Sequence, residues 1–150
     1  MGQATPFLLV LSLALGAHGL SAQKCVLAGD WQNDLGSNMT ISPVDEKGNF
    51  TGTYNTSVAT IPSKIQTSPL QGFQKNLTAP IRQPTFGFTV NWNTSEANSI
   101  TVFTGQCFVD KTGKEVLKTV WLLRLHANNI ENYWNATLVG TNDFHRLKKQ

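Results

Sequence analysis

The chain has 150 residues, and its 12 Lys and Arg against 9 Asp and Glu leave a formal net charge of only +3 at pH 7. These charges are interspersed apart from a C-terminal RLKK run, and no basic stripe interleaves with aromatic residues, so a nucleic-acid partner is not expected. The part of the chain that follows an apolar N-terminal run has a suitable length for one domain with a single core.

The first element in chain order is that apolar run, FLLVLSLAL, at residues 7–15. It is too short to span a membrane as a helix, and the small residues Gly19 and Ser21 occupy positions that suit a signal-peptidase site. We therefore expect residues 1–21 to be a cleaved signal peptide and residues 22–150 to form a secreted domain. No membrane segment is expected after cleavage.

Short runs with strand composition then alternate with turn signals, and no long segment has helical periodicity. The expected strands are 29–33, 39–44, 50–56, 70–74, 85–92, 101–109, 114–123 and 137–147. The turns DEKG (45–48) and DKTG (110–113) end in glycine, as hairpin turns with positive φ require. One helical turn is expected at 132–134, and residues 61–82, with three prolines, are expected to be mostly loop. Eight strands without crossover helices predict an all-β fold, an eight-stranded antiparallel up-and-down β-barrel.

Two cysteines, Cys25 and Cys107, remain in a chain that we expect to be exported. Pairing is the expected state of two cysteines in an oxidising compartment, so we predict one intrachain disulfide and no metal site. Sequons of the type Asn-X-Ser/Thr provide six candidate glycosylation sites. These are Asn38, Asn49, Asn55, Asn76, Asn93 and Asn135.

Several expected strands place large aromatic and small polar residues on the same face. Tyr54 shares a face with Thr56, and Asn142 shares one with Phe144. A plain barrel core would have aliphatic residues there. Each polar group taken singly is more simply explained by a backbone or water partner. The recurrence of this mixed aromatic and polar face on several strands favours a closed cavity for one small ligand.

Six stretches give the sequence a specific resemblance that runs from Cys25 to Leu147. They are NDLGSNMTI (33–41), GNFTGTY (48–54), QPTFGFTVNW (83–92), VFTGQCF (102–108), GKEVLKTVWLLR (113–124) and WNATLVGTNDF (134–144). In these stretches the chain resembles the avidin and streptavidin family of biotin-binding proteins. That resemblance implies a secreted protein that binds biotin non-covalently and with high affinity, as a homotetramer, without a cofactor. It also implies a role in vitamin sequestration as an antimicrobial defence, or in biotin storage and transport in eggs.

The resemblance also implies a set of ligand contacts. Biotin has a cyclic urea, and its carbonyl oxygen would accept hydrogen bonds from Asn33, Ser37 and Tyr54, while its two N–H groups would donate to Thr56 and Asn142. The apolar wall would consist of Trp92, Phe103 and Trp121, with Thr101 beside them. Trp134 would come from a neighbouring subunit.

Two loops depart from the family pattern. At 59–61 the residues Ala59, Thr60 and Ile61 replace a more hydroxyl-rich segment, in which Thr60 remains a candidate donor to the biotin carboxylate. Two extra residues lengthen the stretch from Trp92 to Phe103, so the approach of Thr94, Ser95, Ala97 or Ser99 to the ligand stays open. Asn135 replaces a basic residue beside Trp134, and His145 replaces a threonine.

Three other functions compete with biotin binding. An enzyme is not expected, because neither His126 nor His145 lies in a nucleophile motif and the inward strand positions carry no Asp or Glu. A lipocalin-like carrier of another small apolar ligand would use a similar secreted barrel, but it would need a chiefly aliphatic interior. An avidin relative with weakened biotin affinity is the third possibility.

Overall fold

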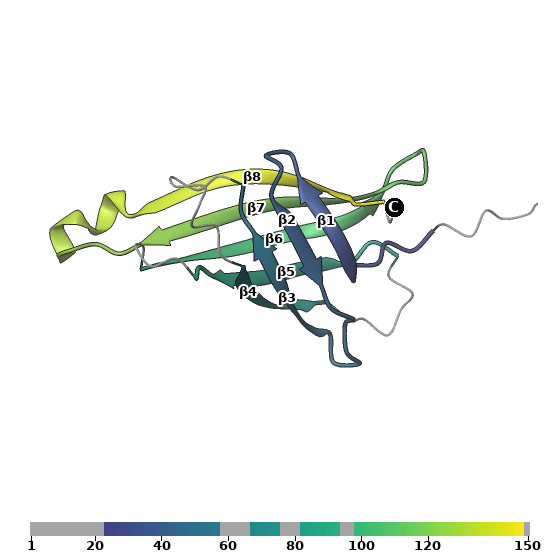
Figure 1. Ribbon diagram of the computed structural model, residues 1–150, viewed down its shortest axis with the longest axis horizontal. Coiled ribbons are helices and arrows are strands. Elements are labelled where there is room, and N and C mark those ends of the chain that lie inside the picture. Colours follow the sequence, from purple (N-terminus) through teal and green to yellow (C-terminus); the bar gives the residue numbers. More distant parts are fainter. Residues whose placement is uncertain (1–22, 58–66, 76–81, 94–97, 149–150) are drawn as a thin grey trace, which may run out of the picture.

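Each strand of the structure pairs antiparallel with the next strand in the sequence, and the last strand returns to pair with the first. The computed structural model describes residues 23–57, 67–75, 82–93 and 98–148 (Figure 1). In these residues the elements are β1 (Gly29–Asn33), β2 (Asn38–Ile41), β3 (Asn49–Asn55), β4 (Ser68–Gln74), β5 (Thr85–Asn91), β6 (Ser99–Val109), β7 (Glu115–Leu125), the 3₁₀ helix η2 (Ile130–Asn135) and β8 (Thr137–Arg146). The predicted eight-stranded antiparallel barrel is confirmed.

Closure depends on the pairing of β1 with β8, in which Asn33 lies opposite Phe144 and Trp31 opposite Arg146. Figure 1 shows β6, β7 and β8 as long strands that extend beyond the short β1 and β2 toward η2. A closed barrel leaves no strand unpaired along a whole edge, and here each strand pairs with a neighbour on both sides over at least part of its length.

The interior is formed by alternate residues of the strands. In β5, for example, Phe86, Phe88 and Val90 are buried, while Thr85 and Asn91 are exposed. This period-two burial is what the sequence pattern predicted. The core is unusually aromatic, because Phe86, Phe88 and Phe103 stack in series with ring centroids 6.1 and 4.7 Å apart.

Trp31 of β1 is fully buried and is held by several contacts. Its indole nitrogen donates to the carbonyl oxygen of Leu27 at 2.8 Å, and the Arg146 guanidinium lies 4.1 Å from the ring centroid. Arg146 also forms an ion pair with Glu115 and hydrogen bonds to the carbonyl oxygens of Val26 and Ala28. The disulfide between Cys25 and Cys107 joins the segment before β1 to β6, as predicted.

Every strand except β1 differs from its predicted bounds at one or both ends, by at most three residues, and the clearest differences are in β2, β4 and η2. β2 ends at Ile41 instead of Val44, because Pro43 has no backbone N–H with which to continue the ladder. β4 begins at Ser68, and it includes Pro69 because the pairing of β4 with β5 starts only at Leu70. The predicted helical turn at 132–134 is part of the longer η2.

The two predicted hairpin turns are confirmed, with Gly48 at φ 90° and Gly113 at φ 81°. A third glycine, Gly36, has φ 84° in the turn between β1 and β2. Residues with a side chain rarely adopt these angles, whereas glycine adopts them readily. Among the residues that the structure describes, no helix has the length and apolar character needed to cross a membrane.

Candidate ligand-binding site

The centre of the candidate site is a group of buried polar side chains at the β1–β2 turn and on β3. Asn33 ends β1, Ser37 lies in the turn, and Tyr54 comes from β3; all three are buried. The Asn33 amide nitrogen donates to the Tyr54 hydroxyl at 3.1 Å. The structure therefore buries these three residues together, whereas their contact with a ligand stays a prediction.

The orientation of the Asn33 amide is decided by its backbone partners. Its oxygen accepts from the backbone N–H groups of Leu35 at 3.0 Å and Ser37 at 2.8 Å. A backbone N–H can only donate, so the oxygen side must face the turn. The NH₂ group therefore faces Tyr54 and presents a donor there.

The Tyr54 hydroxyl stays protonated over a wide pH range. Burial raises the pKa of Tyr54 to about 12, with a further upward contribution from the charge of Asp34; hydrogen bonds to Ser37 and Asn33 act in the opposite direction. A protonated phenol keeps its donor hydrogen. At neutral pH, this side chain can therefore donate to a carbonyl oxygen.

On the opposite side of the β1–β2 turn, Asn142 of β8 is buried and its amide nitrogen donates to the Asp34 carboxylate at 2.7 Å. An ionised carboxylate can only accept, so the nitrogen must be the Asn142 atom that faces Asp34. The Asn142 backbone carbonyl meanwhile accepts from the Thr119 hydroxyl at 2.8 Å. The side-chain oxygen of Asn142 faces away from Asp34, and from there it can serve as an acceptor.

Ser37 is held by a residue that follows β3. The Ser57 backbone N–H donates to Ser37 Oγ at 3.0 Å, and the two hydroxyl oxygens are 3.2 Å apart. The Ser57 hydroxyl also donates to the Leu35 carbonyl oxygen at 2.6 Å. The end of β3 is thereby tied to the β1–β2 turn.

Aromatic rings surround Tyr54. Its ring meets Trp92 edge to face at 5.3 Å between centroids and lies against Phe103 at 5.8 Å. The Trp92 indole nitrogen donates to the Thr101 hydroxyl at 2.7 Å, which fixes the plane of that ring. Trp92, Thr101 and Phe103 are thus brought together beside the polar group, and their role as a wall of the ligand site stays a prediction.

Trp121 of β7 lies opposite Phe103 of β6 and opposite Gly140 of β8 in the strand register. A Cβ atom on Gly140 would lie only 2.3 Å from the Trp121 ring, so the glycine leaves the space in which the indole lies. The Trp121 indole nitrogen is buried and has no hydrogen-bond partner within the part of the chain that the structure describes. An acceptor atom beside it would remove the cost of this unpaired donor.

Other predicted residues are placed differently or lie outside the described residues. Thr56, directly after β3, is half-buried, and Trp134 in η2 is 79% exposed. The structure therefore does not bring Trp134 into this subunit's own polar group. Residues that fall outside the described ranges are Ala59, Thr60, Ile61, Thr94, Ser95, Ala97 and the sequon residue Asn76. The sequon residues Asn38, Asn55, Asn93 and Asn135 are exposed, and Asn49 is half-buried.

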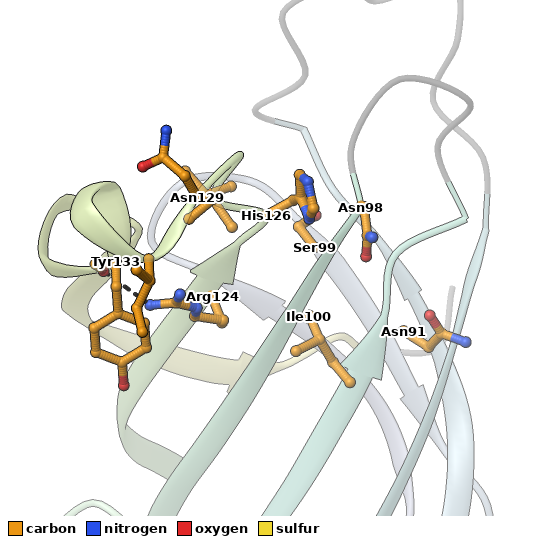
Figure 2. Close-up of a pocket in the computed structure, with 11 residues that line it drawn as sticks. Asn91, Asn98, Ser99, Ile100, Arg124, His126, Asn129 and Tyr133 are labelled. Atoms are coloured by element: carbon orange, nitrogen blue, oxygen red, sulfur yellow. Dashed lines mark hydrogen bonds between the residues drawn. The ribbon is translucent and has the colours of Figure 1, made fainter.

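A separate hollow of about 630 Å³ lies on the outside of the barrel, where the ends of β5, β6 and β7 approach η2 (Figure 2). Figure 2 shows Arg124 beside Tyr133, with the guanidinium carbon 4.2 Å from the centre of the ring. Arg124 also donates to the Tyr133 carbonyl oxygen at 3.2 Å and to the Thr137 hydroxyl at 3.0 Å. Ser99, one of the residues whose approach to the ligand the sequence left open, lines this hollow. The described residues of the predicted biotin-binding set do not line it, so a ligand chamber inside the barrel stays a prediction.

Two residues of the polar network, Asp34 and Ser57, are missing from the set predicted from the sequence. Asp34 follows Asn33 directly, and this position next to a predicted site residue is the sequence feature that could have identified it. Ser57 has outward strand parity and is exposed, and for such a residue strand periodicity gives no signal of a role. Both residues act across the fold, since Asp34 and Asn142 are 108 positions apart.

Residues 21–147 match the model of the Avidin family. Avidin of Gallus gallus is 60% identical over 143 residues, which cover 95% of this chain and 92% of avidin. Avidin-related protein 1 of Gallus gallus is 60% identical over 94% of this chain and 91% of its own length. The solved structure of AVR2 has a TM-score of 0.76 at 56% identity, over 85% of this chain and 100% of its own. Xenavidin has the same TM-score at 51% identity, over 83% of this chain and 100% of its own. By sequence and by fold, the chain belongs to the Avidin family.

Proposed function

We propose that this protein binds biotin non-covalently in the interior of its barrel. The observation that carries this proposal is the fixed orientation of two amides. The Asn33 amide faces Tyr54 with its NH₂ group, and the Asn142 amide gives its NH₂ group to Asp34. One amide therefore offers a donor and the other an acceptor, before any ligand is present.

A cyclic urea has the complementary set of groups. Its carbonyl oxygen would accept from the Asn33 amide, the Ser37 hydroxyl and the Tyr54 hydroxyl. One of its two N–H groups would donate to the Asn142 side-chain oxygen, and we propose Thr56 as the acceptor for the second. Groups held in place before binding lose little freedom when the ligand enters, which favours high affinity.

The remainder of biotin is apolar, and the aromatic side chains supply the matching surface. Trp92, Phe103 and Trp121 would contact the fused rings and the first carbons of the tail, and Thr101 holds the Trp92 indole. The biotin carboxylate would lie near Thr60. Relatives include a protein whose X-ray structure is described as a biotin binding protein from chicken, at 51% identity. Burial of the ligand against these rings is expected to supply most of the affinity.

The direct test is titration of biotin-free protein with biotin, followed by calorimetry and by tryptophan fluorescence. We expect saturation with one biotin per chain and a change in fluorescence from the Trp92 and Trp121 environment. The matched variant Asn33→Ala should bind far more weakly, whereas Gln32→Ala, at the exposed neighbour, should bind like the wild type. Absence of a saturable change at micromolar biotin would reject the proposal. Binding of a fluorescent fatty acid that biotin does not displace would favour a lipocalin-like carrier.

The protein is not an enzyme, because it belongs to a family of non-enzymatic biotin-binding proteins. In the described residues, the grouping of Cys25, Cys107 and Glu115 has metal-ligand spacing, but its two sulfurs form the disulfide. Neither sulfur is therefore a thiolate that could bind a metal ion.

We further propose that the functional form is a homotetramer in which Trp134 enters the site of a neighbouring subunit. Apolar residues are exposed along the outer faces of three adjacent strands: Ile100 and Val102 of β6, Val120 and Leu122 of β7, and Val139 of β8. Such a continuous exposed band is typical of a protein–protein interface. Native mass spectrometry should give four chains, and Trp134→Ala should speed biotin release without unfolding the subunit.

Secretion and glycosylation complete the proposal. The disulfide is consistent with an oxidising compartment, and five sequon residues lie in the described part of the chain, four of them exposed. We propose removal of residues 1–21 and glycans on part of the sequons. Intact-mass measurement of secreted protein, before and after glycosidase treatment, tests both. The biological role, sequestration or storage and transport of the vitamin, would follow from whether the isolated protein already carries biotin.

A further inference from the structure

Ser57 combines three hydrogen-bonding contacts at the edge of the polar group. It follows β3 by two positions and is exposed, yet its contacts converge on two residues of the β1–β2 turn, Leu35 and Ser37. Ser37 itself is 1% exposed. An exposed residue thus contacts a buried hydroxyl of the proposed site.

The direction of each hydrogen bond follows from the number of hydrogens available. A serine hydroxyl has one hydrogen to donate. The Leu35 carbonyl oxygen can only accept, so the 2.6 Å contact uses the hydrogen of Ser57 Oγ. In the 3.2 Å contact between the two hydroxyl oxygens, Ser57 has no hydrogen left, so the donor must be Ser37.

Ser57 therefore holds Ser37 Oγ from two sides, in addition to the hydrogen bond between Ser37 and Tyr54. Ser37 Oγ accepts from the Ser57 backbone N–H at 3.0 Å and donates its own hydrogen to Ser57 Oγ. The accepted bond fixes the position of the oxygen and polarises its O–H, which makes the hydroxyl a better donor. The donated bond is the longer of the two and is the one that a ligand oxygen could replace.

We propose that Ser57 is a positioning residue of the ligand site, acting on the ligand through Ser37. In the free protein, it holds Ser37 Oγ in place and accepts its hydrogen. When the ligand carbonyl oxygen arrives, the Ser37 hydrogen turns from Ser57 to that oxygen, and the Ser57 N–H bond keeps the Ser37 oxygen where it was. The bond to Leu35 ties Ser57 to the turn in both states. This inference depends on the proposed binding of biotin.

The experiment measures the dissociation rate of labelled biotin, chased with excess unlabelled biotin, from six forms of the full chain. These are wild type, Ser57→Ala, Ser57→Thr, Ser37→Ala, the double variant with alanine at both positions, and Thr53→Ala as a control. Thr53 is a matched control because it is an exposed hydroxyl residue of β3, four positions from Ser57. Thermal unfolding of each form verifies that the barrel is intact.

We expect Ser57→Ala to speed release about five- to tenfold, because it removes the hydrogen bond to Leu35 that keeps the Ser57 N–H in place in the bound state. Ser57→Thr keeps the hydroxyl and should stay within about twofold of the wild type, as should Thr53→Ala. In the Ser37→Ala background, adding Ser57→Ala should change the rate by less than about twofold, because the residue through which it acts is gone.

Three results would overturn the inference: unchanged or slower release from Ser57→Ala, equal acceleration in both backgrounds, or failure of threonine to restore the wild-type rate. Equal acceleration would indicate that Ser57 supports only the stability of the turn. These outcomes require a wild type that retains biotin. A wild type that binds no biotin would instead reject the proposed function and this inference together.

Discussion

Two asparagines of the proposed site have amide orientations that neighbouring residues fix, and for Asn142 that neighbour is Asp34. If the amide of Asn142 were reversed, its oxygen would face the carboxylate and an N–H donor would face the ligand. An N–H donor cannot accept the urea hydrogen, so the reversed form would lose a ligand contact and leave two donors opposed. A single carboxylate thus decides whether this side of the site is acceptor or donor.

Asp34→Ala is therefore expected to weaken biotin binding about tenfold, which corresponds to about 1.4 kcal/mol. Calorimetric titration would measure the change. In the Asn142→Ala background, the same substitution should have little effect, because no amide remains to be oriented. Full additivity of the two substitutions would show that Asp34 acts by another route.

The raised pKa of Tyr54 makes a prediction about stability at high pH. Its folded-state value of about 12 lies above the unperturbed value of 10.0. The stabilisation that comes with protonated Tyr54 is therefore fully present below pH 10 and is lost as the pH rises through 12. A shift of this size corresponds to roughly 3 kcal/mol.

We expect the free energy of unfolding to fall between pH 10 and 12, and to fall less in Tyr54→Phe. Denaturant titrations followed by tryptophan fluorescence at several pH values would measure both curves. Tyr133→Phe is the control, because Tyr133 is 63% exposed and its ring lies outside the barrel interior. Parallel curves for wild type and Tyr54→Phe would contradict the prediction.

At the scale of elements, the pairing of β7 with β8 determines where the Trp121 indole can lie. A Cβ on Gly140 would lie 2.3 Å from Cζ2 and 2.7 Å from Cε2 of that ring. Non-bonded carbon atoms do not approach so closely, and the ring is too large to yield by a small rotation. The glycine on β8 therefore provides the space for an aromatic side chain of β7.

Gly140→Ala should displace the indole and weaken biotin binding, with a loss of about 1–3 kcal/mol in stability from overpacking. Near-ultraviolet circular dichroism would report the displaced ring, and titration would report the affinity. Thr141→Ala, at the next and exposed position of β8, should change neither. An unchanged spectrum and affinity for Gly140→Ala would show that the ring has another place to lie.

For the whole molecule, the disulfide links positions 82 residues apart and connects the segment before β1 to β6. A bridge that closes so long a loop restricts the unfolded chain strongly, and the chain-entropy relation gives about 4 kcal/mol. The double variant Cys25→Ser with Cys107→Ser should lose a free energy of unfolding of this order. Denaturant titration would measure it, and dithiothreitol should lower the stability of the wild type but not of the variant. A loss below about 1 kcal/mol would contradict the expectation.

The sequence by itself determined the elements and the faces of this protein. Period-two alternation located each strand to within a few residues, and the glycines at 48 and 113 marked the hairpin turns because few other residues adopt positive φ. The same parity placed Asn33, Tyr54 and Asn142 inward, since side chains in a strand must alternate. The ligand identity came from resemblance, because alternation does not encode which molecule fills an interior.

Only the tertiary structure decided which side chains hold the polar residues in place. Asp34 reaches Asn142 only because β8 closes onto β1, and Ser57 reaches Ser37 only because β3 ends beside the β1–β2 turn. The physical reason is the difference in sequence separation between the two kinds of contact. Strand patterns arise from neighbours two residues apart, whereas hydrogen bonds between distant segments form only after the barrel has closed.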